Sequence, residues 1–178
     1  MLKHRLIVVA FTASLFPALA SAADYGRPPL VVVSPWVGHY IGIAGGAGWH
    51  EFRWLADVFG GYNIATGTNM IIGVEADAAL IDTGSAAVRT PWAAALRGRV
   101  GWATFNSMLY FAGGLAIGQI VGPGSSATDV GWTLGLGVEA NMRPNVRGRI
   151  EYRYTNLGTV SFSSGQSDVL AGVSMTFR

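Results

Sequence analysis

Arginine and carboxylate side chains recur at alternate positions in several segments of this chain. Glu75 is followed two residues later by Asp77, and Arg97 by Arg99. The segment 147–153 carries Arg, Arg, Glu and Arg at every second position. Side chains two residues apart lie on the same face of a β-strand, and a guanidinium forks onto a carboxylate while staying charged. The spacing therefore predicts strands whose charged faces meet in a buried ion-pair network. Its expected members are Arg53, Asp57, Glu75, Asp77, Arg97, Arg99, Glu139, Arg147, Arg149, Glu151 and Arg153.

Two interpretations of this charged set are open. Six arginines face five carboxylates, and buried charges need partners because the removal of an ion from water is costly. The first interpretation is a structural plug of mutually neutralising groups, and the second is an arginine-lined pore for anions. Near-neutrality and a narrow interior favour the plug. A symmetric turn centred on Arg143 would place Glu139 directly opposite Arg147.

Residues suited to catalysis or metal binding are few. Beyond the N-terminal leader the histidines are His39 and His50, and the chain has no cysteine, which excludes disulfides and thiolate metal sites. The sequence has no His-Glu-x-x-His motif, nucleophile elbow or phosphate-binding glycine loop. We therefore expect no enzymatic activity, no cofactor and no metal. His50, in the first outer turn, is either a solvated loop histidine or a surface ligand for haem or metal.

Apolar and polar residues alternate with period two along most of the chain, which predicts β-strands. The eight expected strands are 37–48, 52–63, 69–80, 92–103, 108–119, 130–140, 146–155 and 167–177. Short turns are expected at 64–68, 104–107 and 141–145, and longer loops at 81–91, 120–129 and 156–166, with 49–51 a short exception on the loop side. This layout is typical of outer-membrane barrels. The predicted fold class is all-β, an eight-stranded antiparallel up-and-down transmembrane β-barrel over residues 36–178.

The residues on the two strand faces decide whether such a barrel is soluble or embedded in a membrane. In the third predicted strand Val74 lies on the apolar face, and Glu75 and Asp77 share the opposite face. A soluble barrel buries its apolar face, whereas a membrane barrel turns that face to lipid. The charged faces here are rich in Gly and Ala, which leave room for large neighbours inside a narrow barrel. This favours charges inside. The first two strands fit less well, because His39 falls on the apolar phase and Phe59 on the polar phase.

Aromatic residues at strand ends support the membrane interpretation. Trp92 and Trp102 share a face of one predicted strand and lie ten residues apart. Ten residues span about 33 Å, or about 25 Å of height at a tilt of about 40°. This matches the separation of two aromatic girdles, although scattered core aromatics are the alternative. The expected girdle residues are Trp36, Tyr40, Trp92, Trp102, Trp132 and Tyr154.

The first 22 residues have the layout of a secretory signal peptide. A basic start is followed by an apolar stretch and by Ala20-Ser21-Ala22, where we expect cleavage after Ala22. Pro17 interrupts the apolar stretch, which argues against a membrane anchor. Residues 23–35 contain three prolines and are predicted to form a periplasmic N-terminal arm. Without the two bases of the leader, ten arginines balance ten acidic residues, so no basic excess remains to attract nucleic acid.

Seven short segments follow one another along most of the mature chain. They are SAAD at 21–24, WVGHYIG at 36–42, GGYN at 60–63, IGVEAD at 72–77, LRGRVG at 96–101, YFAGGLA at 110–116 and EYRY at 151–154. Through them the chain resembles the small alphaproteobacterial outer-membrane β-barrel proteins, the porin-family or outer-membrane immunogenic proteins. The resemblance implies an eight-stranded barrel with roles in envelope structure and surface contact. It also implies that the barrel-assembly machinery reads the C-terminal strand, where Arg178 follows the aromatic Phe177. Some members of the family are described as haemin-binding, but no motif here transfers that role.

The leading hypothesis is therefore a non-enzymatic integral outer-membrane barrel that supports envelope integrity and surface interaction, with a plugged lumen. Two alternatives stay open: a small-solute porin-like channel, and a surface protein that binds haem or a host ligand. The expected partners are outer-membrane lipid, the barrel-assembly machinery through Phe177, and an unidentified surface ligand. No nucleic acid is expected.

Overall fold

The structure, a computed structural model, describes residues 35–48, 53–67, 69–82, 89–158 and 164–177. The predicted signal peptide and nearly all of the predicted arm lie outside these residues, as does His50. No helix in the described part of the chain is long and apolar enough to cross a membrane.

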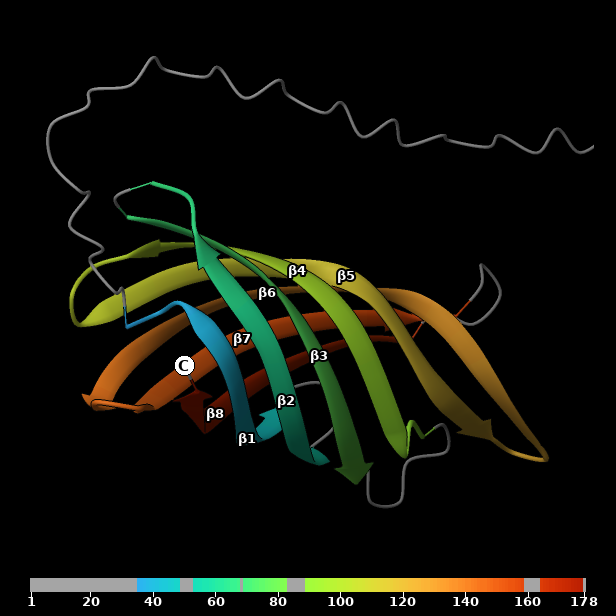
Figure 1. Cartoon of the computed structure of the whole chain (residues 1–178). Helices are drawn as coiled ribbons and strands as arrows, with labels where there is room; N and C mark the ends of the chain where they lie inside the picture. Colours follow the sequence, from blue (N-terminus) through green and yellow to red (C-terminus); the bar gives the residue numbers. More distant parts are fainter. Residues whose placement is uncertain (1–34, 49–52, 68, 83–88, 159–163, 178) are drawn as a thin grey trace, which may run out of the picture. The chain divides into compact units, whose positions relative to one another are not determined.

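Eight antiparallel strands form a closed barrel (Figure 1). Each strand pairs with its neighbours in the sequence, and β1 closes the barrel by pairing with β8. The strands are β1 (Gly38–Gly48), β2 (Arg53–Ala65), β3 (Met70–Asp82), β4 (Trp92–Ala103), β5 (Ser107–Gly122), β6 (Ser125–Arg143), β7 (Val146–Leu157) and β8 (Ser164–Phe177). Each predicted strand corresponds to one of these, so the predicted fold class is confirmed.

The barrel has two unlike ends. The terminal end, as we call it, contains the start of β1, the end of β8 and the short turns β2–β3, β4–β5 and β6–β7. The loop end contains the connections β1–β2, β3–β4, β5–β6 and β7–β8. An even number of strands brings both ends of the chain's barrel segment to the same side.

The β5–β6 connection differs from the predicted long loop at 120–129. The two strands continue to Gly122 and from Ser125, and their ladder extends to that pair. Only Pro123 and Gly124 form the turn, and Gly124 has the positive φ of 79° that tight hairpins require. The composition of this stretch indicates a turn, but Ile120 and the residues beside it pair across the hairpin. The prediction of a long loop here is wrong.

The β6–β7 hairpin also departs from the symmetric turn expected from the sequence. Arg143 pairs with Val146, and the register shifts between Asn141 and Arg143. The turn residues are Pro144 and Asn145, and the turn position and the shift together place Arg149, rather than Arg147, opposite Glu139. The extra residue is accommodated as in a β-bulge, which no period-two pattern reveals.

The polarity of the barrel is inverted relative to that of a soluble protein. On β4, Leu96 is 64% exposed, whereas the adjacent Arg97 is 1% exposed. Leu80, Leu115 and Ile43 are likewise more than 60% exposed. An exterior of aliphatic side chains around a charged interior is the arrangement that a surrounding hydrocarbon phase favours. Because the barrel is closed, the backbone N–H and C=O groups of every strand are hydrogen-bonded to neighbouring strands and no sheet edge is exposed.

Candidate functional site

The interior of the barrel contains all eleven charged residues that the sequence analysis grouped together. None of their side chains belongs to a residue more than 8% exposed. Asp168 on β8 is a twelfth member, at 5% exposed, which the predicted set omitted although it occupies the polar phase of its strand. With Asp168, six arginines meet six carboxylates in the described interior, so the formal charges balance.

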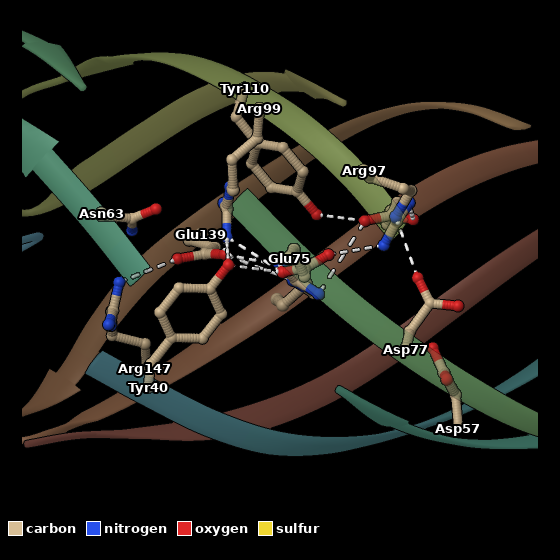
Figure 2. Close-up of polar contacts among 12 residues, drawn as sticks. Tyr40, Asp57, Asn63, Glu75, Asp77, Arg97, Arg99, Tyr110, Glu139 and Arg147 are labelled. Atoms are coloured by element: carbon tan, nitrogen blue, oxygen red, sulfur yellow. Dashed lines mark hydrogen bonds and ion pairs between the residues drawn. The ribbon is translucent and has the colours of Figure 1, made fainter. Parts of the chain in front are cut away.

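Arg97 contacts three carboxylates, of which Glu75 and Asp77 are labelled in Figure 2. Its Nη2 is 2.5 Å from Glu75 Oε1, its Nε is 2.9 Å from Asp77 Oδ1, and its Nη1 is 2.6 Å from Glu151 Oε1. Glu75 and Asp77 belong to the adjacent β3, whereas Glu151 belongs to β7. One guanidinium therefore ties β4 to a neighbouring strand and to a strand that does not pair with it.

Two further arginines both contact Glu75 and Glu139, toward the terminal end of the barrel. Arg99 places Nη1 3.1 Å from Glu75 Oε2 and Nη2 2.7 Å from Glu139 Oε1. Arg149 Nη2 contacts Glu75 Oε2 and lies 3.0 Å from Glu139 Oε1. Arg147 adds a contact of 3.2 Å to the other oxygen of Glu139. Every carboxylate oxygen of this pair thus has at least one guanidinium beside it.

Arg153 extends the network toward the loop end. Its Nε is 2.8 Å from Glu151 Oε1, its Nη2 is 3.0 Å from Asp57 Oδ2, and its Nη1 is 3.4 Å from Asp77 Oδ2. The side chains come from β7, β2 and β3. The ion pairs therefore bridge strands on different sides of the barrel.

Tyrosines and a phenylalanine pack among these charges. Tyr40 Oη donates a hydrogen bond to Glu75 Oε2 at 2.8 Å, and Tyr110 Oη donates one to Glu151 Oε2 at 2.5 Å. The centre of the Arg149 guanidinium lies 4.0 Å from the centroid of the Phe59 ring. Such cation–π contacts stabilise a desolvated cation. The two tyrosines share the polar phase of their strands, and this is the signal that could have placed them in the network.

Each of these three rings lies against a glycine of the adjacent strand. Tyr40 is opposite Gly61, and Phe59 is opposite Gly42. Tyr110 stands in the same relation to Gly137. A Cβ on any of the three glycines would overlap the facing ring. The glycines on the polar faces thus provide the space in which the large interior side chains fit.

Trp36 and Tyr40 do not belong to the outward girdle in which they were predicted. They are 1% and 4% exposed, and Trp36 Nε1 donates to the Thr104 carbonyl at 2.8 Å. Tyr40 shares its face of β1 with Ala44, whereas Ile41 points outward. The girdle prediction for these two residues is wrong. Tyr40 lies on the inward-facing phase of β1, and the side chain of Trp36 is buried.

The other predicted girdle residues face outward, with different degrees of exposure. Trp102 is 61% and Trp132 is 45% exposed, while Trp92 and Tyr154 are half-buried. The rings of Tyr154 and Trp132 are in contact at a tilt of 42°, with centroids 5.3 Å apart. An amphipathic ring on the lipid-facing surface suits the interface between hydrocarbon and water, and a girdle role for these four residues stays a prediction.

The interior toward the loop end is more loosely filled. It contains a cavity with about 30 Å³ of space for water centres, which suffices for about one or two water molecules. Gln166 Nε2 donates to Thr90 Oγ1 at 2.9 Å above it, and Arg53 pairs with Asp168 at 2.6 Å. Small or polar residues of its wall include Ala79, Ala93, Ala95, Ala116, Thr133 and Thr155.

Metal-binding geometry is not found in the part of the chain that the structure describes, where no three His, Cys, Asp or Glu side chains are suitably grouped. His39 is exposed on the outer face, with its ring 4.6 Å from that of Tyr62. His50, the candidate surface ligand, lies outside the described residues. The arrangement therefore offers charge pairing and packing as its chemistry.

A closed antiparallel barrel with an apolar exterior and a paired, charged interior is a transmembrane β-barrel of the outer-membrane type. In such barrels the short turns face the periplasm, which assigns the terminal end to the periplasmic side and the loop end to the cell surface.

Comparison with known proteins agrees with this class. The family model described as "Outer membrane protein beta-barrel domain" matches residues 8–177. The 25 kDa outer-membrane immunogenic protein of Brucella abortus is 34% identical, over 88% of this chain and 86% of its own length. The 22 kDa outer membrane protein of Rhizobium leguminosarum bv. viciae is 33% identical, over 84% of this chain and 82% of its own. The chain belongs to the outer-membrane β-barrel family and is an outer-membrane protein.

Solved structures share the fold at low sequence identity. Neisserial surface protein A has a TM-score of 0.55 at 17% identity, covering 78% of this chain and 96% of that protein. The N-terminal barrel domain of Pseudomonas aeruginosa OprF has a TM-score of 0.56 at 15% identity, with the same coverage. The names of these relatives and neighbours describe outer-membrane and surface proteins, and none of them names an enzyme.

Proposed function

We propose that this protein is a closed, non-enzymatic barrel that supports the integrity of the outer membrane and contributes to surface contact. The observation that carries the proposal is the charge network across the interior. An eight-stranded barrel is only wide enough for its own side chains, and here six arginines, six carboxylates and three aromatic rings occupy that space.

The pairing within the network argues against an anion pore. Each of the six buried arginines has a guanidinium nitrogen within 3.2 Å of a carboxylate oxygen. A passing anion would have to compete with carboxylates that are covalently held in place, and the removal of one partner from a buried pair leaves an uncompensated charge. The network thus acts as a plug and as a set of ties between strands.

The proposed partners follow from the exterior and the two ends. Exposed aliphatic side chains contact outer-membrane lipid, and β8 ends in the outward-facing Phe177, 51% exposed, where the barrel-assembly machinery would read the strand. The Brucella relative is named for its immunogenicity, and this supports a surface role for the loop end here. Export by a signal peptide cleaved after Ala22 is part of the same proposal.

Deletion of the gene separates this proposal from a channel. A strain that lacks the protein should become more sensitive to detergents and bile salts, while its uptake of small anions and sugars is unchanged. The wild-type gene should restore resistance, and a copy carrying Leu136→Arg on the lipid face should not, because an arginine near mid-membrane costs about 2–4 kcal/mol. Reduced uptake with unchanged detergent sensitivity would instead favour the channel.

A further inference from the structure

Trp36 stands just before β1, and its indole lies across the opening of the barrel at the terminal end. The residue is 1% exposed. It belongs to an apolar cluster whose other buried members are Ile71 on β3, Ala103 on β4, and Met108, Tyr110 and Ala112 on β5. Because β1 is hydrogen-bonded to β2 and β8, all of these residues come from strands that do not adjoin β1. The indole therefore packs against the wall opposite the strand that it precedes.

The turn from Trp36 into β1 depends on Gly38. This glycine has a φ of 115°, which residues with a side chain rarely adopt, and a Cβ there would lie 2.8 Å from the Phe177 carbonyl oxygen. Two hydrogen bonds hold the tryptophan beyond the turn. Its Nε1 donates to the Thr104 carbonyl at 2.8 Å, and its own carbonyl accepts from Asn63 Nδ2 at 3.1 Å. The position of the indole is thus fixed by contacts to the β4–β5 turn and to β2.

The indole covers the charge network at Arg147. The centre of this guanidinium lies 5.5 Å from the centroid of the Trp36 ring and 5.3 Å from that of Tyr40. Figure 2 shows Arg147 and Tyr40 at one end of the drawn network and Asp57 at the other. Arg147 is 1% exposed, and cation–π contacts are stronger when the cation is desolvated. The indole therefore excludes water from this arginine and stabilises its charge.

We propose that Trp36 is a stopper that closes the periplasmic end of the barrel and keeps water and ions from the charge network. This inference rests on the closed barrel proposed above and adds a second seal in series with the network. A tryptophan side chain buries about 150–250 Å², which suits it to cover a lumen only wide enough for side chains. Trp102 is the matched control, because it lies at the same end but faces outward, 61% exposed.

Thiol labelling measures the seal directly, because the chain has no cysteine of its own. Met108→Cys places a thiol in the cluster around the indole, at a residue 1% exposed, and Phe105→Cys, at 88%, gives the rate of an open site. On the folded protein in detergent micelles, a charged thiosulfonate should label Met108→Cys about a hundredfold more slowly than Phe105→Cys. Addition of Trp36→Ala should speed the labelling of Met108→Cys about tenfold, whereas Trp102→Ala should leave it unchanged.

Further measurements separate a stopper from a general loosening of the barrel. Ala116→Cys, on the wall of the loop-end cavity, should be labelled at one rate with and without Trp36→Ala. Added indole should restore slow labelling of Met108→Cys in the Trp36→Ala background, because it refills the same space and can donate to the Thr104 carbonyl. Trp36→Phe retains a ring without the hydrogen bond and should give an intermediate rate, and it is the second variant should Trp36→Ala not fold.

Three results would overturn the stopper. The first is labelling of Met108→Cys as fast as Phe105→Cys with Trp36 in place, a comparison that needs no change at the tryptophan. The second is an equal effect of Trp36→Ala and Trp102→Ala, and the third is faster labelling of Ala116→Cys together with Met108→Cys.

Single-channel recording keeps this outcome apart from the proposed function. Conductance by the wild-type protein would contradict the closed barrel, whatever the labelling shows. Conductance by Trp36→Ala alone would leave the stopper standing and would make it, rather than the charge network, the seal against ions. Slow labelling that depends on Trp36, with both proteins silent, is the result expected for two seals in series.

Discussion

The two halves of the barrel interior are built differently. From the centre toward the terminal end, Arg97, Arg99 and Arg149 share carboxylates, and Arg99 and Arg149 also pack against the Tyr110 ring. Toward the loop end, alanines and threonines surround a small cavity. The first half is filled by large charged and aromatic side chains, whereas in the second the alanines and threonines share the cavity wall with larger residues such as Leu55, Leu170 and Arg153.

This difference indicates that the two halves of the barrel have different structural roles. In the terminal half, ion pairs connect strands that are not neighbours, so the positions of those strands depend on one another. In the loop half, single contacts such as Gln166 to Thr90 and Arg53 to Asp168 close the mouth. A rigid base that supports adjustable loops is the arrangement on which surface function is usually built. We expect substitutions to cost more stability in the terminal half.

The largest effect is expected for Glu75→Gln. Glu75 accepts contacts from Arg97, Arg99 and Arg149, and loss of its charge leaves a buried surplus of positive charge, which costs about 3–5 kcal/mol. Asp168→Asn is the matched change in the loop half. It breaks one buried ion pair, with Arg53, and should cost less than Glu75→Gln, about 1.5–3 kcal/mol, because only one arginine loses its partner. Urea unfolding in lipid vesicles, followed by tryptophan fluorescence, measures both, and equal losses would remove the proposed difference between the halves.

A smaller effect is expected when volume is added to each half. Gly137→Ala would push a Cβ against the Tyr110 ring and should cost about 1–3 kcal/mol, as overpacking does. Ala116→Val places two methyl groups beside the loop-end cavity and should leave stability within about 0.5 kcal/mol of wild type. The same unfolding assay applies to both variants. If Ala116→Val proved as damaging as Gly137→Ala, the loop half would be as tightly packed as the terminal half.

A small change in stability is also expected at the mouth of the barrel, where access to the cavity can be measured as well. Thr90→Val removes the hydrogen bond that Thr90 accepts from Gln166, at a cost of about 1 kcal/mol. Because the chain has no cysteine, Ala116→Cys can serve as a single probe of the cavity. A water-soluble thiol reagent should label it faster when Thr90→Val is also present. An unchanged labelling rate would show that this contact does not control access.

The sequence predicts the strands and most of their facing because period-two alternation is a local property. It is clear on β4, where Arg97 and Arg99 alternate with Leu96 and Val100, and all four lie on the predicted faces. The identity of the charged interior residues follows from the same alternation. Asp168 on β8 belongs to the interior set by the same alternation, because its phase points inward.

The remaining features depend on contacts between strands, which alternation does not encode. The phase of β1 points Tyr40 inward, but its fit over Gly61 follows only from the register of β1 and β2. The turn at Pro144 and Asn145, together with an irregularity between Asn141 and Arg143, sets Arg149 opposite Glu139. The irregularity arises from one extra residue in β6, and the sequence around it reads as an ordinary turn.

Single-channel recording tests the central claim, a closed interior, most directly. Purified wild-type protein is inserted into planar bilayers, and the shift in gel migration between unboiled and boiled samples verifies that it is folded. The charge network predicts no stable conductance steps in potassium chloride at either polarity. Reproducible steps of uniform size from the folded wild-type barrel would contradict the account, because ions would then cross the layer in which Arg97 and Glu75 are paired.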